Sequence, residues 1–522
     1  MPLPPDELGA LTDAALGAAG ECGAAELRVE RIRSQIVRLH DARPETTADD
    51  TDFGMGVRVV VDGAVGFAAS VDVRPDEAAA LVRRAKEMAD VTSRAGGGRV
   101  ELAPEPSHGE VIWTSSFEVD PSTVPMAEKI ALLAEWSRRL GEHPVVAHSS
   151  ASLRAVSEQT YLADLNGTRA TQHRVRLQAQ LEALALSDTG FETMRTIAPP
   201  VGRGWEYLAG PVSTGNWDWD AELAQLPELL AEKLAAPSVE SGTYDLVVDP
   251  SNLWLTIHES IGHATELDRA VGYEAAYAGT SFATFDKLGT LHYGSPVMHV
   301  TGDRSVAHGL ATVGIDSEGV AGQSFDLVRD GVLVGYQLDR GIAAAMGFER
   351  SNGCAFADSP MHVPIQRMAN VSLAHAGDDG PDTDELIGGV DRGIYIVGDK
   401  SWSIDMQRYN FQFTGQRFYR IAGGKLAGQL KDVAYQATTT DDRLLGRHGG
   451  GGRRIDLGAR RCVQLRQGPT GPGGAGVARL PVGARARRAG AQRTRGVGAL
   501  SVPATGPPVT DQPVSDQPWA RA

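Results

Sequence analysis

Residues Trp254–Asp268 read W-L-T-I-H-E-S-I-G-H-A-T-E-L-D, and they place a glutamate between two histidines in the pattern H-E-x-x-x-H. Imidazole nitrogens are good zinc ligands, and a neighbouring carboxylate can accept a proton from a metal-bound water. In the shorter pattern H-E-x-x-H, the histidines lie roughly 40° apart around a helix and face one ion. The longer spacing places His258 and His263 roughly 140° apart on a regular helix, which is too divergent for one ion.

One extra residue in the helical turn would remove this divergence. A one-residue π-bulge returns both histidines to the same side, and such bulges cluster at functional sites. Gly262 is permissive enough to occupy the distorted turn. The stretch therefore predicts a metal site in which His258 and His263 are ligands and Glu259 is the base. The alternative is a helix whose histidines are satisfied by hydrogen bonds and whose glutamate is solvated.

The segments around this stretch predict a β-rich domain. A strand, Y-D-L-V-V-D-P at 244–250, comes directly before it, and an apolar run at 253–257 enters the predicted buried helix. Many short β-type runs broken by Gly, Asp and Asn follow, such as S-F-D-L-V-R-D-G-V-L-V-G-Y-Q-L at 324–338. Such runs are typical of antiparallel sheets and barrels. We therefore expect a β-rich, barrel-like C-terminal domain over residues 242–441.

The N-terminal half predicts two smaller units, 1–98 and 120–238, joined by a proline-containing linker at 99–124. In the first unit, residues 25–39 alternate apolar and charged side chains, as a half-buried strand does. β-rich runs around Asp62-Gly63 predict a hairpin, and Pro75 opens a helical run. In the second unit we expect helices at 126–140 and 220–235, with a meander of strands and an Asn166-Gly167 turn between them. The expected fold class is α+β, with two N-terminal α/β units before the barrel-like domain.

Composition limits the classes of function. The chain has 522 residues, of which 42% are hydrophobic and 22% charged, and its formal net charge is -16. Such a negative chain is not expected to bind nucleic acid or an anionic membrane by charge. The N-terminus lacks the pattern of a signal peptide, and no apolar stretch is long enough to span a membrane. Three scattered cysteines do not form a disulfide framework, so we expect a cytoplasmic protein.

The stretch H-E-S-I-G-H-A-T-E-L-D closely resembles the metal motif of the TldD subunit in the TldD/PmbA (TldD/TldE) metallopeptidase family. Other segments agree in the same order, from about residue 5 to about residue 441. They are G-T-S-F-A-T at 279–284, D-G-V-L-V-G-Y-Q-L-D-R at 330–340, R-S-N-G at 350–353, P-I-Q-R-M-A-N at 364–370 and D-E-L-I at 384–387. Several motifs in a fixed order make the resemblance specific.

The resemblance implies a function and a partner. His258 and His263 would bind zinc in the β-rich domain, and Glu259 would activate water. The implied third ligand is a cysteine in a glycine-rich segment near the C-terminus. The family implies a heterodimer with a PmbA/TldE-like subunit, which lacks the histidine motif, and substrates that are peptides or unfolded proteins.

The composition changes abruptly after Asp441. Residues 443–495 contain thirteen arginines, no lysine and one aspartate, without a strand or helix period. The segment 442–522 is therefore expected to be an aberrant Arg/Gly/Pro-rich tail, either a disordered basic extension or the product of a frameshift. Residues 443–468 can be encoded by codons whose next frame reads F-W-G-G-M-E-A-V-G-G-G-S-T-W-A-R-G-A-A-F-N-C-G-K-G, which resembles the missing end of the family. The hidden cysteine codon would straddle Leu465 and Arg466, so Cys462 is not assigned as a ligand.

The loss of a third ligand keeps a second function open. Two histidines and water hold zinc less firmly than a set that includes a thiolate. The alternative to a zinc-dependent peptidase subunit is therefore a non-catalytic peptide-binding or scaffold subunit. Cys354 is interpreted as a small core residue.

Two acidic and three aromatic side chains that follow the motif allow two interpretations each. Glu266 and Asp268 could orient a histidine, but a solvated helix face is the favoured interpretation. Tyr273, Tyr277 and Phe282 could line a substrate groove, but aromatic residues at this spacing are more often part of a core.

Overall fold

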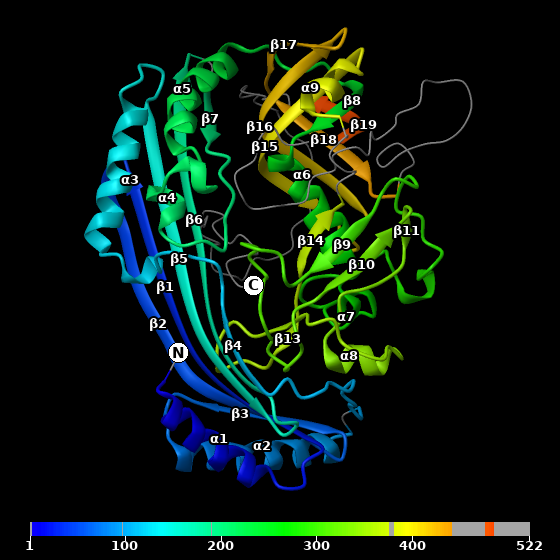
Figure 1. The fold of residues 1–522 in the computed structure, drawn as a ribbon. Coiled ribbons are helices and arrows are strands. Elements are labelled where there is room, and N and C mark those ends of the chain that lie inside the picture. The colour runs from blue at the N-terminus through cyan, green and yellow to red at the C-terminus, as the bar shows by residue number, and fades with distance from the viewer. Residues whose placement is uncertain (1–2, 97, 189, 375–380, 441–475, 485–522) are drawn as a thin grey trace, which may run out of the picture.

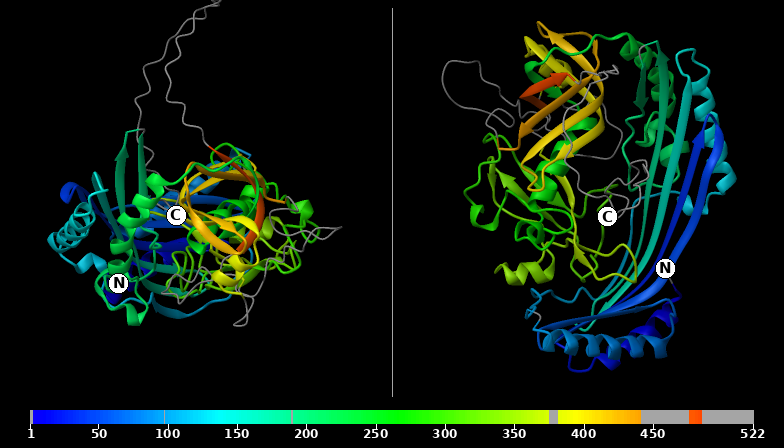
Figure 2. Two further views of the ribbon diagram at one scale, coloured as in Figure 1. Left: turned by 90° about the horizontal axis from the view of Figure 1, so that it is seen from above. Right: turned by 180° about the vertical axis from the view of Figure 1, so that it is seen from behind.

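The structure of the chain is a computed structural model that describes residues 3–96, 98–188, 190–374 and 381–440, and the backbone of 476–484. A curved sheet of long strands forms one side of the molecule, and the β-rich C-terminal domain lies beside it (Figures 1 and 2). The strand order of the long sheet is β3-β2-β1-β5-β6-β4, and β7 also pairs with β6. Its strands are β1 (Ala24–His40), β2 (Arg43–Val61), β3 (Ala64–Ser70), β4 (Glu110–Thr114), β5 (His148–Asp164), β6 (Arg169–Ser187) and β7 (Gly190–Arg195).

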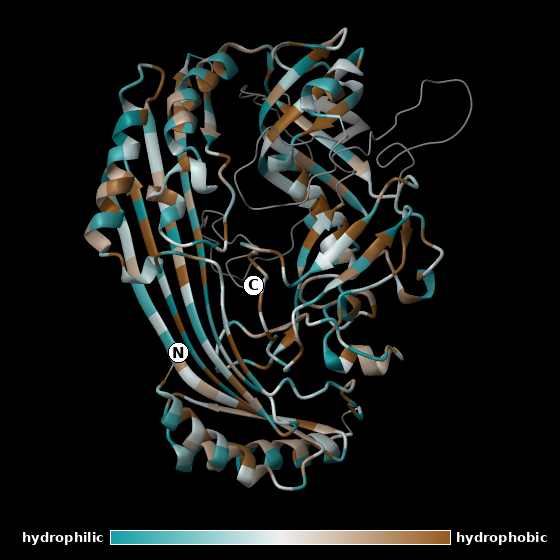
Figure 3. Cartoon of the chain, viewed as in Figure 1, coloured by the Kyte–Doolittle hydropathy of each residue, from teal (hydrophilic) through white to brown (hydrophobic). Residues whose placement is uncertain are grey.

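Local sequence explains the hairpins of this sheet. The expected hairpin around Asp62-Gly63 is confirmed, because the turn joins β2 to β3 with positive φ angles of 50° and 82° at its two residues. This conformation matches the twist of the flanking strands and favours Asp-Gly. The Asn166-Gly167 turn joins β5 to β6 as expected. Hydrophobic and polar residues alternate along the long strands (Figure 3), so one row of side chains faces a core.

The two predicted N-terminal units share this one sheet, because β1 pairs antiparallel with β5 from Glu26 to His40. Their cores nevertheless remain separate. One core lies under α1 (Pro5–Ala19) and α2 (Pro75–Arg94), and the other lies under α3 (Met126–Gly141) and α5 (Trp219–Ala235), near the short helix α4 (Glu206–Ala209). The helices at 126–140 and 220–235 are thus confirmed to within one residue. Among the described residues, no helix combines the length and apolarity needed to cross a membrane.

The expected linker contains a strand. β4 lies within 99–124 and pairs in parallel with the start of β6, at the edge of the long sheet. Prolines at 104, 106 and 121 flank this strand without interrupting it. An edge strand tolerates neighbouring prolines because only one side of its backbone is paired.

The C-terminal domain is rich in β-structure, which confirms the α+β fold class. Its larger sheet has the order β15-β8-β19-β18-β16-β17, and its first strand, β15, also pairs with β16. Its strands are β8 (Gly242–Val248), β15 (Arg392–Ile404), β16 (Asn410–Ala422), β17 (Lys425–Leu430), β18 (Val433–Thr438) and β19 (Gly476–Ala484). The smaller sheets contain β9 (Val300–Asp303), β10 (Ser324–Arg329), β11 (Val332–Leu333) and β14 (Asn370–Leu373), and β12 (Ala355–Phe356) with β13 (Ile365–Gln366). The helices are α6 (Pro250–Ile257), α7 (Leu267–Ala270), α8 (Arg340–Ala345) and α9 (Thr383–Gly388).

Most of the predicted aberrant tail lies outside the described residues. Its backbone at 476–484 forms β19, which pairs antiparallel with β8 and with β18. The sequence predicted no strand here. A strand edge offers unpaired N–H and C=O groups to any extended segment, and these backbone bonds require no side-chain period.

Buried ion pairs join the long sheet to the C-terminal domain. Arg58 on β2 pairs with Glu26 on β1 at 2.7 Å, and it also donates a hydrogen bond to Glu318 of the C-terminal domain. The backbone N–H of Arg340 donates to the same carboxylate, with an N–O distance of 2.7 Å. The two parts of the molecule therefore meet through a network of paired charges.

Candidate metal centre

The three predicted site residues lie at the end of α6. Asp249 caps this helix through a 2.9 Å hydrogen bond from the N–H of Ser251. A π-helical turn, η3, runs over His258–Gly262, and a 3₁₀ turn, η4, continues over His263–Thr265. The π-bulge expected from the H-E-x-x-x-H spacing is confirmed.

The π turn brings the two histidines together. Their ring centroids lie 4.5 Å apart, with the rings edge to face at 79°. Ligand atoms of His258, Glu259 and His263 all lie within 4.8 Å of one another. One ion can therefore be reached by both imidazoles while the carboxylate stands beside it.

Gly262 supports this turn for a reason other than the expected one. Its φ of -53° is ordinary for a helix, so the turn does not depend on glycine's backbone freedom. A Cβ at this position would lie 2.5 Å from Sδ of Met368. A Cβ here would therefore displace the end of the Met368 side chain, which is flexible enough to move.

Side chains satisfy the carbonyl groups of the π turn. Gln337 donates from Nε2 to the carbonyl of Gly262 at 2.6 Å, and the hydroxyl of Thr265 donates to the carbonyl of Ile261 at 2.8 Å. These bonds matter because a widened turn no longer follows the regular helical ladder.

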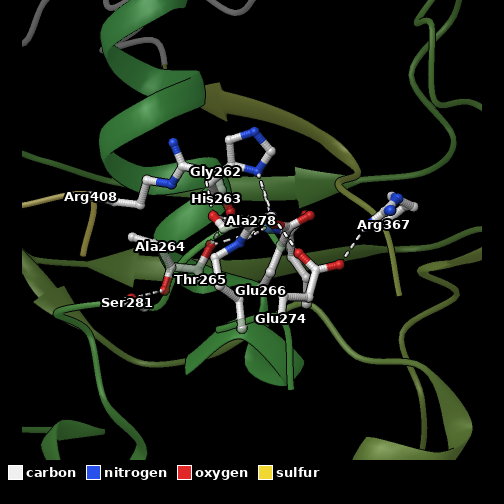
Figure 4. A network of polar contacts seen from close by, with 12 residues as sticks. Gly262, His263, Ala264, Thr265, Glu266, Glu274, Ala278, Ser281, Arg367 and Arg408 are labelled. Atoms are coloured by element: carbon white, nitrogen blue, oxygen red, sulfur yellow. Dashed lines mark hydrogen bonds and ion pairs between the residues drawn. The ribbon is translucent and has the colours of Figure 1, made fainter. Parts of the chain in front are cut away.

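Glu266 holds His263. Its Oε2 lies 2.8 Å from Nδ1 of His263 and 2.7 Å from Nη2 of Arg269 (Figure 4). Burial favours the neutral acid, but His263 and Arg269 overcome this effect and lower the pKa of Glu266 to about 2. With Nδ1 engaged, the other ring nitrogen of His263 can bind a metal. The expected solvated face is wrong for Glu266, whose exposed fraction is 1%.

The same network continues away from His263. Arg269 also pairs with Glu274 at 2.9 Å, and Glu274 pairs with Arg367 at 2.9 Å (Figure 4). Asp268 is buried as well, and burial together with Glu266 and Glu274 raises its pKa to about 8. The solvated interpretation is therefore wrong for Asp268 too.

Glu259 is buried and paired rather than solvated. Its exposed fraction is 2%, and its Oε2 accepts a 3.1 Å hydrogen bond from Nη1 of Arg408. Arg408 lies in the turn between β15 and β16 with a φ of 63°, and its Nη2 donates to the carbonyl of Ala278 at 2.8 Å. Arg408 is not predictable from the sequence, because nothing local in the chain links this turn to the histidine motif.

His258 has the properties of a neutral ligand. Burial and the adjacent His263 lower the pKa of its imidazole well below the usual value. Neutral imidazole is the form that binds metal. Two such rings, one of them oriented by a carboxylate, form a donor set that suits zinc.

A third strong ligand is absent from the described residues around this site, where the only metal-ligating group is His258, Glu259 and His263. Cys354 is fully buried among other side chains, and burial raises the pKa of its thiol to about 12, which confirms the core interpretation. Cys462 lies outside the described residues.

The aromatic residues near the motif divide into two groups. Phe282 is buried and packs against Tyr293 and Tyr409, so the core interpretation is confirmed for it. Tyr273 and Tyr277 are 74% and 78% exposed, so neither belongs to a core. Whether they line a groove stays a prediction.

Two family profiles match the chain. The PmbA/TldA metallopeptidase C-terminal domain matches residues 241–442, which include the whole candidate site, and domain 1 of the same family matches residues 25–89. This chain belongs to the PmbA/TldD metallopeptidase family. The C-terminal match ends at residue 442, where the composition of the chain changes.

Relatives within the PmbA/TldD family carry metalloprotease names. The "Metalloprotease" of Methanothermobacter thermautotrophicus is 27% identical over 455 residues, which cover 86% of this chain and 92% of the relative. The "Metalloprotease TldD homolog" of Haemophilus influenzae is 26% identical over 73% of this chain and 75% of its own length. The "Zinc metalloprotease TldD homolog" of Saccharolobus solfataricus is 24% identical over 43% of this chain and 47% of its own length.

Solved structures of low sequence identity share the fold. A putative modulator of a DNA gyrase from Thermotoga maritima superposes with a TM-score of 0.70 at 15% identity, covering 91% of this chain and 100% of that one. TldE from Thermococcus kodakarensis superposes with a TM-score of 0.64 at 16% identity, covering 91% of this chain and 98% of that one.

Proposed function

We propose that this chain is a zinc-dependent peptidase subunit that hydrolyses peptides or unfolded proteins in the cytoplasm. The observation that carries the proposal is the π turn, which brings His258, Glu259 and His263 within reach of one ion. The metalloprotease names of the relatives support the reaction class, and the name of one of them includes zinc.

In this mechanism His258 and His263 would hold the metal. A zinc ion held there would supply Lewis acidity, which lowers the pKa of a bound water and polarises a carbonyl. Glu259 would accept the proton of a water at this site, since it is the carboxylate beside the two imidazoles. Arg408 fixes Oε2 of Glu259 by a hydrogen bond, and Glu266 fixes the tautomer of His263 through Nδ1.

The partner is proposed to be a PmbA/TldE-like subunit. The TldE structure from Thermococcus kodakarensis shares the fold of this chain over most of its length. Two chains of related fold can present complementary surfaces, as subunits of many assemblies do.

The second candidate function is a non-catalytic peptide-binding or scaffold subunit. It is favoured by one observation, which is that the described residues provide two histidines at the site and no third strong ligand. Catalytic zinc sites usually have three protein ligands and one open position. This candidate predicts complex formation with the partner without stoichiometric zinc.

A frameshift near residues 441–443 would explain the missing ligand. We propose that the gene, read in its intact frame, encodes the glycine-rich cysteine segment. An uninterrupted codon series across this point, together with a protein mass that matches the printed sequence, would reject the frameshift.

Replacement of Glu259 by Gln separates the two functions. We expect Glu259→Gln to keep bound zinc and to lower peptide cleavage by roughly 10²- to 10⁴-fold, because the variant keeps the shape of the side chain and loses the base. Elemental analysis measures the bound zinc. The rate of hydrolysis of an unfolded-protein substrate, in the presence of the partner, measures cleavage.

His258→Ala is the matched control, for which both zinc and cleavage are expected to be lost. Equal cleavage by the wild-type protein and Glu259→Gln would rule out Glu259 as the base. A wild-type protein that binds its partner, binds no zinc and does not cleave the substrate would favour the scaffold function.

A further inference from the structure

A second cluster of metal-ligating side chains lies in the long sheet rather than in the C-terminal domain. It consists of His40, Asp41 and His148, whose ligand atoms all lie within 4.8 Å of one another. His40 ends β1, Asp41 begins the turn to β2, and His148 begins β5. The pairing of β1 with β5 brings His148 to the other two residues, although it is more than a hundred positions away along the chain.

The spacing of these ligand atoms fits one ion. Nδ1 of His148 lies 2.9 Å from Oδ2 of Asp41, and Nε2 of His40 lies 3.4 Å from the same oxygen. Because zinc bonds to nitrogen and oxygen ligands are about 2.0 Å long, two ligands of a tetrahedral ion lie about 3.3 Å apart. Both measured separations are close to this value, so small side-chain rotations are enough to place an ion among the three groups.

The backbone holds the carboxylate of Asp41 in position. Its Oδ1 accepts a 2.9 Å hydrogen bond from the N–H of Ser149, and its own N–H donates to the carbonyl of Ser149 at 2.8 Å. The turn is also tied to α3, because the N–H of Ala42 donates to Oγ of Ser137 at 2.9 Å. With Oδ1 engaged, Oδ2 faces the histidines. A ligand that is already ordered loses less conformational freedom when an ion binds.

An ordinary surface pair in the same chain shows what is special about this cluster. Nδ1 of His362 lies 2.7 Å from Oδ1 of Asp358, and this pair belongs to no metal-ligating group among the described residues. The carboxylate of Asp41 instead faces two imidazoles, those of His40 and His148, whose ring centroids lie 5.5 Å apart. Two histidines and one carboxylate form a donor set that suits zinc and related divalent ions. The second histidine therefore distinguishes a metal site from a hydrogen-bonded pair.

We propose that His40, Asp41 and His148 bind one divalent transition-metal ion, such as zinc. The side chains are 57%, 43% and 53% exposed, so an ion can enter from solvent and water can complete its coordination. The bound ion joins the turn between β1 and β2 to the start of β5 and thereby stabilises this end of the long sheet. The site shares no residue with the metal centre and does not depend on the proposed peptidase activity.

The full-length wild-type protein and His148→Gln, compared in parallel, test this site. Equilibrium dialysis against a series of zinc concentrations, followed by elemental analysis, measures the zinc bound per chain. Zinc at the metal centre contributes equally to both proteins, so the difference between them isolates the new site. We expect the wild-type protein to bind one more zinc ion per chain than the variant. Its Tm is expected to rise with zinc by a saturable amount that His148→Gln lacks, because an ion that binds the folded state stabilises it by mass action.

His40→Gln is the second variant, and it is expected to lose the same zinc ion and the same part of the Tm response. It leaves the contact between His148 and Asp41 in place, so it tests whether the second imidazole is needed. His362→Gln is the matched control, because His362 is an exposed histidine that also contacts an aspartate and has no second histidine beside it. Its zinc binding and its Tm response are expected to equal those of the wild-type protein.

Two results would overturn the proposal. Equal amounts of bound zinc in the wild-type protein, His40→Gln and His148→Gln would show that the cluster is a set of hydrogen-bonded surface residues and no metal site. An extra zinc ion in the wild-type protein without any difference in the Tm response would reject the stabilising role of the ion. Both variants alter exposed side chains, so their unliganded stability is expected to remain close to that of the wild-type protein.

Discussion

At the scale of single residues, the metal centre depends on side chains that lie outside the histidine motif. Glu266 engages Nδ1 of His263, and Arg408 engages Oε2 of Glu259. Each contact selects one orientation of a side chain that would otherwise rotate. A carboxylate that orients a metal-binding histidine also raises the basicity of the ring.

Replacement of Glu266 by Gln tests this orienting role. We expect the variant to bind zinc about 10- to 100-fold more weakly, because the amide removes the negative charge beside His263. The measurement is a zinc titration against a competing chelator. Asp268→Asn is the control, since Asp268 is also buried but is bonded to the backbone of Arg269 rather than to a histidine. Equal zinc affinity in the wild-type protein and Glu266→Gln would contradict the assignment.

At the scale of single elements, the π turn depends on close packing between Gly262 and Met368. The widened turn places both histidines on one side, and Met368 fills the volume where a side chain would project. The turn therefore contacts the segment before β14, in addition to making its own hydrogen bonds.

Gly262→Ala is expected to destabilise the protein by about 1 kcal/mol, the lower end of overpacking costs, because only the flexible end of Met368 has to move to admit the Cβ. Chemical denaturation measures the change in the free energy of unfolding. Gly17→Ala in α1 is the control, since a Cβ there meets no atom within 4 Å, and it is expected to be neutral or slightly stabilising. Addition of Met368→Ala to Gly262→Ala is expected to recover part of the loss. A double variant as unstable as the sum of its parts would argue against this contact.

The helix α5 carries a buried lysine that makes stability depend on pH. Lys233 donates from Nζ to the carbonyl of Thr193 on β7 at 3.0 Å. Burial, and then the nearby charge of Lys400, lower its pKa from 10.5 to about 7. Above pH 7 the folded state has released this proton while the unfolded state still holds it. The folded state is therefore favoured increasingly as the pH rises toward 10.5.

Lys233→Met removes this dependence. Between pH 7 and pH 9 the free energy of unfolding of the wild-type protein is expected to rise relative to the variant by about 2 kcal/mol. Denaturant titrations of both proteins at the two pH values measure the difference between their free energies of unfolding. The contributions of the other titrating groups are common to both proteins and cancel in this difference. A constant difference would show that Lys233 keeps an ordinary pKa.

At the scale of the whole molecule, buried charge pairs connect the long sheet to the C-terminal domain, beside a small apolar cluster of Leu162, Ala170 and Ile315. Arg58 is the central residue, because it pairs with Glu26 of its own sheet and with Glu318 across the boundary. A buried pair becomes costly when one partner is removed, since the remaining charge has no compensation.

Arg58→Met is therefore expected to lower the free energy of unfolding by about 3–5 kcal/mol. Thermal and chemical denaturation measure the effect. Adding Glu26→Gln and Glu318→Gln is expected to recover much of the loss, because the variant then leaves no buried negative charge. An Arg58→Met variant with the free energy of unfolding of the wild-type protein would show that solvent reaches these carboxylates.

The sequence predicted local features of the fold well and long-range features poorly. The hairpin at Asp62-Gly63, the long helices and the π turn all depend on neighbouring residues, whose spacing is visible in the chain. The pairing of β1 with β5 and the contact of Arg408 with Glu259 join distant segments, and no local period records them. The burial of Glu266 also escaped prediction, because a glutamate after a helix is usually solvated and only its partners made it a core residue.

The position of β8 has a consequence for the order of events during synthesis. All strands of the long sheet precede residue 242, so that sheet can assemble while the ribosome is still translating the C-terminal domain. β8 pairs with β15 and β19, which emerge much later. Until then the backbone N–H and C=O groups on both edges of the apolar strand β8 have no strand partner, and such a strand is prone to aggregation. A chain whose synthesis ends before residue 392 would therefore contain a complete long sheet and an incomplete, aggregation-prone C-terminal domain.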